Sequence, residues 1–325
     1  MSDEPAQPIH NPHDRFFKQI FSRLETTREF LRAHLPRRLV RAAKWHTLKL
    51  RPGSFVDERL AAYSSDLLFS VELRGSPLLL YCLFEHRSTV DPNMPFRLLV
   101  YMVRIWEQWF KEADPGQKPP CIIPIVLHQG GEAWSVSTHF LDWLEVPEEL
   151  KDEVGRFQPD FEHVLVDLSR MPVEEMGGEL VGRVALSFMK AVREGGVEPW
   201  LERFESALGE LARTPDKVEV FRTLMRYWFA VDAAEAKGPS TAEQLLSRIE
   251  NQRVRERVMS IAEELLERGR KEGEQRGRLG GGIQLCEQVL GLPVSSVEDL
   301  QAREVADLER LLEELEGNLR QRMAR

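Results

Sequence analysis

The sequence lacks the features of a membrane protein or of a disulfide-stabilised fold. No apolar run approaches the roughly 20 residues that a membrane-spanning helix requires. The stretch MSDEPAQPIHNPHD at the start is polar and acidic, so we expect a cytoplasmic protein with no membrane partner. The three cysteines, Cys82, Cys121 and Cys286, are far apart, and their spacing fits neither a zinc site nor a disulfide framework.

Charge is distributed unevenly along the chain. The 325 residues carry a net charge of −9, which argues against a protein that coats nucleic acid generally. Residues 1–51 oppose this trend, because eleven basic and five acidic side chains give them a net charge of +6. Such a basic segment fits transient contact with a nucleic-acid backbone. A solvated helix surface is the alternative.

Hydrophobic periodicity predicts an α/β fold with a helical extension. Alternating or continuous apolar residues predict strands at 67–73, 78–84 and 121–130, a fourth strand at 161–168, and an irregular segment or short strand at 48–56. Helical spacing predicts helices at 13–34 and 96–110, and mostly helical structure from the end of the fourth strand at residue 168 to about residue 231. No internal repeat is present.

The composition changes towards the end of the chain. Residues 241–268 read as a charged helix, and the run GRKEGEQRGRLGGG at 269–282 reads as a polar, glycine-rich linker. The tail, 283–325, reads as two or three short helices, of which EVADLERLLEELE is the clearest.

The strands at 67–73 and 78–84 read as a hairpin with an acidic residue at each outer end. A tight turn centred on Gly75 and Ser76 would place Asp66 directly opposite Glu85, with side chains on one face and Cβ atoms about 5 Å apart. Arg87 would emerge on the same face. Facing carboxylates destabilise a fold unless something neutralises them.

A divalent cation is one way to neutralise such a pair. Mg²⁺ is commonly held by one or two carboxylates together with waters and substrate phosphate oxygens, and it activates water for phosphodiester hydrolysis. The alternative is structural: the acids are solvated at the open end of the hairpin, or are neutralised by Arg87 or by Arg97.

The wider sequence resembles a known nuclease family. Five stretches occur in order: HDRFFKQIFS at 13–22, SDLLFSVEL at 65–73, LLYCLFEHRSTVD at 79–91, MPFRLLVYMVRIWEQW at 94–109 and PIVLHQGGEAW at 124–134. They resemble the Rpn family of recombination-promoting nucleases and putative transposases, within the PD-(D/E)XK nuclease superfamily. The resemblance covers roughly residues 10–270, and the tail resembles a small domain of unknown function.

The resemblance implies a metal-dependent DNA endonuclease. The expected fold is a restriction-endonuclease-like core, a mixed central sheet flanked by helices, with a helical extension. Asp66 and Glu85 match the two motif carboxylates that hold Mg²⁺ or Mn²⁺, and the carbonyl of His86 is a third candidate ligand. Arg87 stands where the family usually has Lys or Gln. Arginine can stabilise transition-state charge, but its pKa above 12 rules it out as a base.

Three further residues are accessory candidates. His13 and Asp14 begin the first family-like stretch and are expected near the metal, with an N-cap role as the alternative for Asp14. Arg97 could bind a phosphate or pair structurally with Glu85.

Two functions therefore remain open, each with the same predicted domains. We expect a nuclease-like domain at 1–235, a charged helix and linker at 236–280, and a small helical domain at 281–325. The first function is DNA cleavage linked to recombination or mobile elements. The second is a degenerate nuclease fold that acts as a DNA-binding or assembly module, motivated by Arg87 and the acidic net charge. Homo-oligomerisation through the carboxyl-terminal helices is compatible with both.

Overall fold

The computed structural model describes residues 12–51, 66–85, 89–235, 252–301, 303 and 305–323. The chain forms two compact units, Met1–Arg257 and Val258–Arg325, which are described separately. The predicted three-part division at residues 235 and 280 stays a prediction. Within the described ranges, no helix is both long and apolar enough to cross a membrane.

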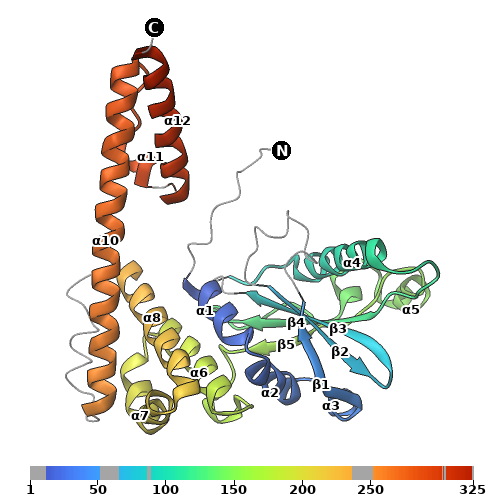
Figure 1. The fold of residues 1–325 in the computed structure, drawn as a ribbon. Helices are drawn as coiled ribbons and strands as arrows, with labels where there is room; N and C mark the ends of the chain where they lie inside the picture. Colours follow the sequence, from blue (N-terminus) through green and yellow to red (C-terminus); the bar gives the residue numbers. More distant parts are fainter. Residues whose placement is uncertain are drawn as a thin grey trace. The chain divides into compact units, whose positions relative to one another are not determined.

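A five-stranded mixed sheet forms the centre of the first unit (Figure 1). Its strands are β1 (Ala43–Leu50), β2 (Leu67–Leu73), β3 (Ser76–Glu85), β4 (Cys121–His128) and β5 (Val164–Asp167), in that spatial order. The first three strands pair antiparallel, whereas β3, β4 and β5 pair in parallel. The prediction of an α/β fold with a mixed sheet flanked by helices is therefore confirmed.

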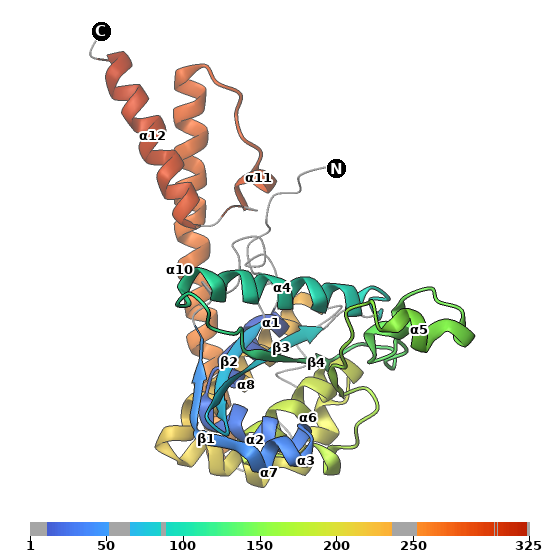
Figure 2. The same cartoon turned by 90° about the vertical axis from the view of Figure 1, so that its right-hand side faces the viewer.

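Helix α4 (Met94–Glu112) connects β3 to β4 and covers one face of the sheet (Figure 2). Its buried face packs with alternate sheet residues in one apolar cluster, which includes Leu68, Tyr81, Leu83, Leu98, Tyr101 and Ile105. The intervening sheet positions, such as Phe69 and Leu80, are equally buried. These positions face the side of the sheet opposite to α4. Helices α2 (Leu24–His34) and α6 (Leu180–Glu194) lie on that side, and α2 contacts β1.

The remaining described elements of this unit are short connectors or helices. They are α1 (Pro12–Phe21), α3 (Arg37–Ala42), η2 (Phe140–Trp143), η3 (Glu148–Leu150), α5 (Lys151–Gly155), η4 (Val173–Glu175), α7 (Val197–Arg213), η5 (Pro215–Lys217) and α8 (Val218–Glu235). Helix α1 contacts α8, although their sequences lie about 200 residues apart. This contact brings the first family-like stretch against the end of the helical region.

The predicted helix at 13–34 is two helices. Arg23 adopts an extended conformation, with φ −77° and ψ 111°, and separates α1 from α2. The Thr27 hydroxyl donates to the carbonyl of Phe21, which no longer has a helical partner. Neither glycine nor proline marks this break, so the apolar spacing on both sides read as one helix.

Strand β1 lies earlier than the predicted segment at 48–56. Only Leu48 is fully buried in its sequence AKWHTLKL, and its register with β2 shifts between Lys44 and Lys49. An irregular edge strand with one buried side chain gives little alternation to recognise.

The hairpin turn lies at Arg74 and Gly75, one residue earlier than predicted. Both residues have positive φ, 50° and 94°, as a two-residue type I′ turn requires. Leu73 pairs with Ser76. In the predicted turn, Pro77 would have closed the hairpin, but proline has no N–H to donate. Here Pro77 pairs with Glu72 instead.

This shift corrects the predicted pairing of Asp66 with Glu85. Leu67 pairs with Cys82, and the same register extended by one residue places Leu83 opposite Asp66. Glu85 lies two positions farther along β3, where its backbone pairs with that of His128. A slip of two residues, unlike a slip of one, leaves the face on which each position lies unchanged.

The second unit contains the end of α10 (Gln252–Leu290) together with α11 (Val297–Gln301) and α12 (Val305–Met323). Ile283, Leu300, Leu308 and Leu315 form its buried cluster. The predicted glycine-rich linker is wrong, because α10 continues through residues 269–282. A Cβ atom at Gly282 would lie 3.2 Å from the Leu312 side chain, so glycine there allows α12 to approach closely. Packing of this kind outweighs the low helix propensity of glycine.

The turn yields a first prediction. Gly75→Ala should lower the free energy of unfolding by roughly 1–2 kcal/mol, because alanine pays a steric cost in the left-handed region. Arg74→Asn should be neutral or slightly stabilising, since Asn-Gly is the preferred type I′ pair. Urea unfolding measures both. Two variants with equal stability would contradict the turn assignment.

Candidate active site

Asp66 lies directly before β2, at the end of the hairpin opposite to the turn. The Tyr81 hydroxyl of β3 donates to Asp66 Oδ2. Tyr81 pairs with Leu68 across the hairpin, so its position and that of Asp66 share one face of the sheet. This hydrogen bond fixes one of the two oxygens of the Asp66 carboxyl group.

The electrostatics of Asp66 are unfavourable for its charged form. Burial is the largest effect on Asp66, and together with the nearby Asp14 carboxylate it raises the pKa, whose net value is about 7. The Tyr81 hydrogen bond, Arg97 and Lys18 each lower it, but they offset burial only in part. Residues from α1, β3 and α4 therefore all act on this one carboxyl group.

Arg97 on α4 is held in place by neighbouring side chains. Its Nη1 atom lies 2.9 Å from Asp91 Oδ2, and its Nη2 atom donates to the Tyr101 hydroxyl at 3.5 Å. Asp91 Oδ1 accepts from the backbone N–H of Asn93 at 2.9 Å, which fixes the carboxylate in turn. Arg97 is thus a positioned cation near Asp66, and Asp91 is one of its ion-pair partners.

His13 and Asp14 lie in the first turn of α1, which begins at Pro12. Asp14 is past the N-cap position, so the N-cap alternative is wrong. Its effect on the pKa of Asp66 brings it to the same site. His13 Nδ1 lies 2.7 Å from the hydroxyl of Tyr227 on α8.

The other predicted site residues lie at the end of β3. The backbone of Glu85 is the last of the strand. The Glu85 side chain, His86 and Arg87 lie outside the described residues. Among the side chains that are described, no group of three His, Cys, Asp or Glu residues is arranged to hold a metal ion.

Reasoning from the sequence missed three residues that make hydrogen bonds around the site, namely Tyr81, Tyr227 and Gln129. Tyr81 carried one available signal: it is the only hydroxyl in the apolar run LLLYCLF, and a buried phenol usually finds a hydrogen-bond partner. Burial by the apolar interior raises the pKa of Tyr81 well above its ordinary value. Tyr81 therefore stays protonated and acts as a donor.

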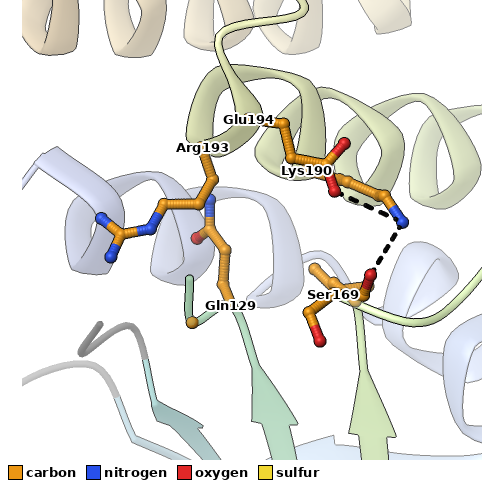
Figure 3. A pocket seen from close by; sticks show the side chains of 7 residues that line it. Gln129, Ser169, Lys190, Arg193 and Glu194 are labelled. Atoms are coloured by element: carbon orange, nitrogen blue, oxygen red, sulfur yellow. Dashed lines mark hydrogen bonds and ion pairs between the residues drawn. The ribbon is translucent and has the colours of Figure 1, made fainter. Parts of the chain in front are cut away.

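A small pocket that is open to solvent lies past the ends of β4 and β5 (Figure 3). Lys190 of α6 donates to the carbonyls of Ser169 and Met171 at 3.2 and 3.0 Å, and it lies 3.6 Å from Glu194. Figure 3 shows Arg193 directed away from Lys190. Lys190 therefore ties the loop after β5 to α6, and the pocket is explained by this structural role.

Asp66 yields a second prediction, on stability. Its pKa rises from 3.8 to about 7 in the folded protein, so between about pH 4 and 7 the folded state holds a proton that the unfolded chain has lost. Binding of this proton stabilises the folded state. Its contribution is fully present below about pH 4 and is lost as the pH rises through about 7. At pH 8 the free energy of unfolding of the neutral variant Asp66→Asn should therefore exceed that of wild type by on the order of 2 kcal/mol, allowing for partial exposure.

Urea unfolding at pH 4.5 and pH 8 checks this, and the difference should close at the lower pH. Asp142→Asn is a control of opposite sign, because hydrogen bonds from Lys151 and Ser137 lower the pKa of Asp142. A stability difference that is independent of pH would contradict the assignment.

Comparison with known proteins identifies one family and several relatives within it. A model of the family described as "Putative transposase, YhgA-like" matches residues 11–219. The inactive recombination-promoting nuclease-like protein RpnE of Escherichia coli K12 is 30% identical over 284 residues, covering 86% of this chain and 90% of RpnE. No solved structure matches the chain significantly.

Other relatives are named as nucleases. Recombination-promoting nuclease RpnC of Escherichia coli K12 is 35% identical over 170 residues, which cover 52% of this chain and 54% of RpnC. Recombination-promoting nuclease RpnD of Escherichia coli O157:H7 is 29% identical over 259 residues, which cover 78% of this chain and 94% of RpnD. The chain therefore belongs to the Rpn family, the YhgA-like putative transposases.

Proposed function

We propose that this protein is a cytoplasmic, metal-dependent DNA endonuclease with a PD-(D/E)XK core, linked to recombination or mobile elements. The observation that carries the proposal is the Asp66 carboxyl group. It is held by Tyr81 at one oxygen, and burial raises its pKa to about 7. Perturbed carboxyl groups of this kind cluster at functional sites. The family includes relatives that are named as nucleases.

The residues fit a divalent cation. Asp66 and Asp14 are mutually unfavourable carboxylates in a partly buried site, which a cation would relieve. Asp66, Glu85 and the carbonyl of His86 are the proposed ligands. Positions offset by two across an antiparallel pair remain diagonal neighbours that long side chains can span, so the corrected register is compatible with shared ligation. When bound, Mg²⁺ or Mn²⁺ would polarise the phosphodiester and activate water.

The chain's own residues have separate roles in this proposal. Tyr81 orients the Asp66 carboxyl group. Arg97, fixed by Asp91, supplies a positive charge that a substrate phosphate can approach. Arg87 would stabilise charge in the transition state and, as a guanidinium, would not act as a base. The basic residues of 1–51 would contact the DNA backbone and position it without reading sequence.

A catalytically weakened nuclease fold that binds DNA or acts as an assembly module is the second candidate. The relative RpnE, which matches most of this chain, is named inactive. Arg87 in place of Lys or Gln points the same way. Metal binding separates the two candidates, since a vestigial site should bind no Mn²⁺ in a calorimetric titration.

The nuclease proposal gives a third prediction. Wild type should nick supercoiled plasmid DNA with Mg²⁺ or Mn²⁺. Asp66→Ala and Glu85→Ala should each lower the nicking rate at least about a hundredfold. Substitution of residues that only hydrogen-bond to metal ligands already lowers affinity or activity about 10–100-fold, and loss of a ligand should cost more. Asp160→Ala, which removes an exposed aspartate from the same unit, is the matched control and should retain full activity. Equal nicking by all four proteins would reject the proposal.

We also propose that the second unit drives homo-oligomerisation. Leu285 and Val289 lie one turn apart on α10 and are 62% and 58% exposed. Exposed apolar side chains at helical spacing are typical of association surfaces. No exposed Asp, Glu, Lys or Arg interrupts the described side chains between Leu279 and Val297.

A fourth prediction follows for this surface. Leu285→Glu with Val289→Glu should lower the mass measured by light scattering to that of a monomer, because buried carboxylates would oppose association. Exchange of the exposed Glu313 on α12 for Gln is the control. An unchanged mass in the double variant, or a monomeric wild type, would contradict the proposal.

A further inference from the structure

A hydrogen-bond chain, buried except at His13, joins α1 to three other segments of the first unit. His13 Nδ1 lies 2.7 Å from the Tyr227 hydroxyl oxygen. Gln129, directly after β4, donates through Nε2 to the same hydroxyl at 3.3 Å and to the carbonyl of Met189 on α6 at 2.5 Å. The chain therefore runs from α6 through Gln129 and Tyr227 to the first turn of α1.

Packing fixes the position of the Tyr227 hydroxyl. The phenol ring stacks on Phe16, with ring centroids 4.2 Å apart and planes 14° apart, and it meets Phe188 edge-on at 5.9 Å. Tyr227 is 3% exposed, and Gln129 is 2% exposed. A ring held on two sides presents its hydroxyl at one place, so the group it contacts is positioned as well.

We propose that Tyr227, anchored by Gln129, is a positioning residue for the candidate active site. Its hydroxyl donates to His13 Nδ1, which fixes His13 as the neutral tautomer that carries its proton on Nε2. The same bond holds the first turn of α1, where Asp14 acts on Asp66. This inference rests on the proposed nuclease function. It also extends the site beyond residues 11–219, which match the family model.

Two physical arguments support the direction of the Tyr227 hydrogen bond. A hydroxyl that accepts from an amide becomes a stronger donor, and Gln129 Nε2 supplies that amide. The Gln129 Nε2 assignment is itself fixed, because its bond to the Met189 carbonyl requires a donor. In the resulting tautomer His13 Nε2 can only donate, which suits contact with an anionic phosphate oxygen and not removal of a proton from water.

The test uses the full-length protein and Tyr227→Phe, which keeps the stacked ring and removes only the hydroxyl. Thr223→Val on α8 is the matched control, because it also removes a hydroxyl that donates within the unit, to the Glu219 carbonyl at 2.7 Å. Imidazole ¹⁵N NMR at pH 8 reports the His13 tautomer, and the His13→Gln spectrum identifies its signals.

We expect the Nε2–H pattern for His13 in wild type and Thr223→Val, and a mixture of tautomers in Tyr227→Phe. We expect plasmid nicking by Tyr227→Phe to lose about tenfold in kcat with little change in KM, because His13 is mispositioned while DNA contacts remain. A purely structural role would lower the melting temperature without changing the tautomer.

Three results would overturn the inference: an Nδ1–H pattern in wild type, an unchanged pattern in Tyr227→Phe, or wild-type kcat in Tyr227→Phe. Failure of the proposed function looks different. In that case wild type and Asp66→Ala nick equally, and the imidazole spectra still decide whether Tyr227 fixes His13.

Discussion

The pairing of β2 with β3 is the constraint on which the candidate site depends. Pro77 has no N–H, so it cannot close a two-residue hairpin, and the turn falls on Arg74 and Gly75. This register places Tyr81 on the same face as Asp66, within reach of its carboxyl group. The apolar residues between the turn and Asp66 bury the hairpin on both sides and therefore fix the distance from the turn to the site.

The buried carboxyl group of Asp66 at the end of this hairpin is subject to opposing electrostatic effects. Burial and Asp14 oppose its ionisation, whereas Tyr81, Arg97 and Lys18 favour it, and the balance leaves its pKa near 7. Arg97 neutralises the Asp66 carboxylate only in part, because it is also paired with Asp91. The side chains that act on Asp66 come from α1, β3 and α4, so its raised pKa follows from how these elements pack around the sheet.

Periodicity was sufficient to predict β2, β3, β4 and α4, because each has many buried side chains in a regular pattern. It failed where one contact decides the local structure. The break at Arg23 depends on Thr27, and the helix at Gly282 depends on Leu312 from α12. The contact between His13 and Tyr227 joins residues 214 positions apart, and no local pattern in the sequence encodes it.

The fold does not depend on the charge of Asp66. The core of the hairpin consists of apolar residues such as Phe69 and Leu80, which do not depend on Asp66. An ionised Asp66 destabilises the folded state, so a substitution that removes its charge carries no penalty in stability. Asp66 is nevertheless present in this chain, with its Tyr81 donor and near the Arg97–Asp91 ion pair, and the proposed catalytic role supplies a reason to keep a carboxyl group whose ionisation costs stability.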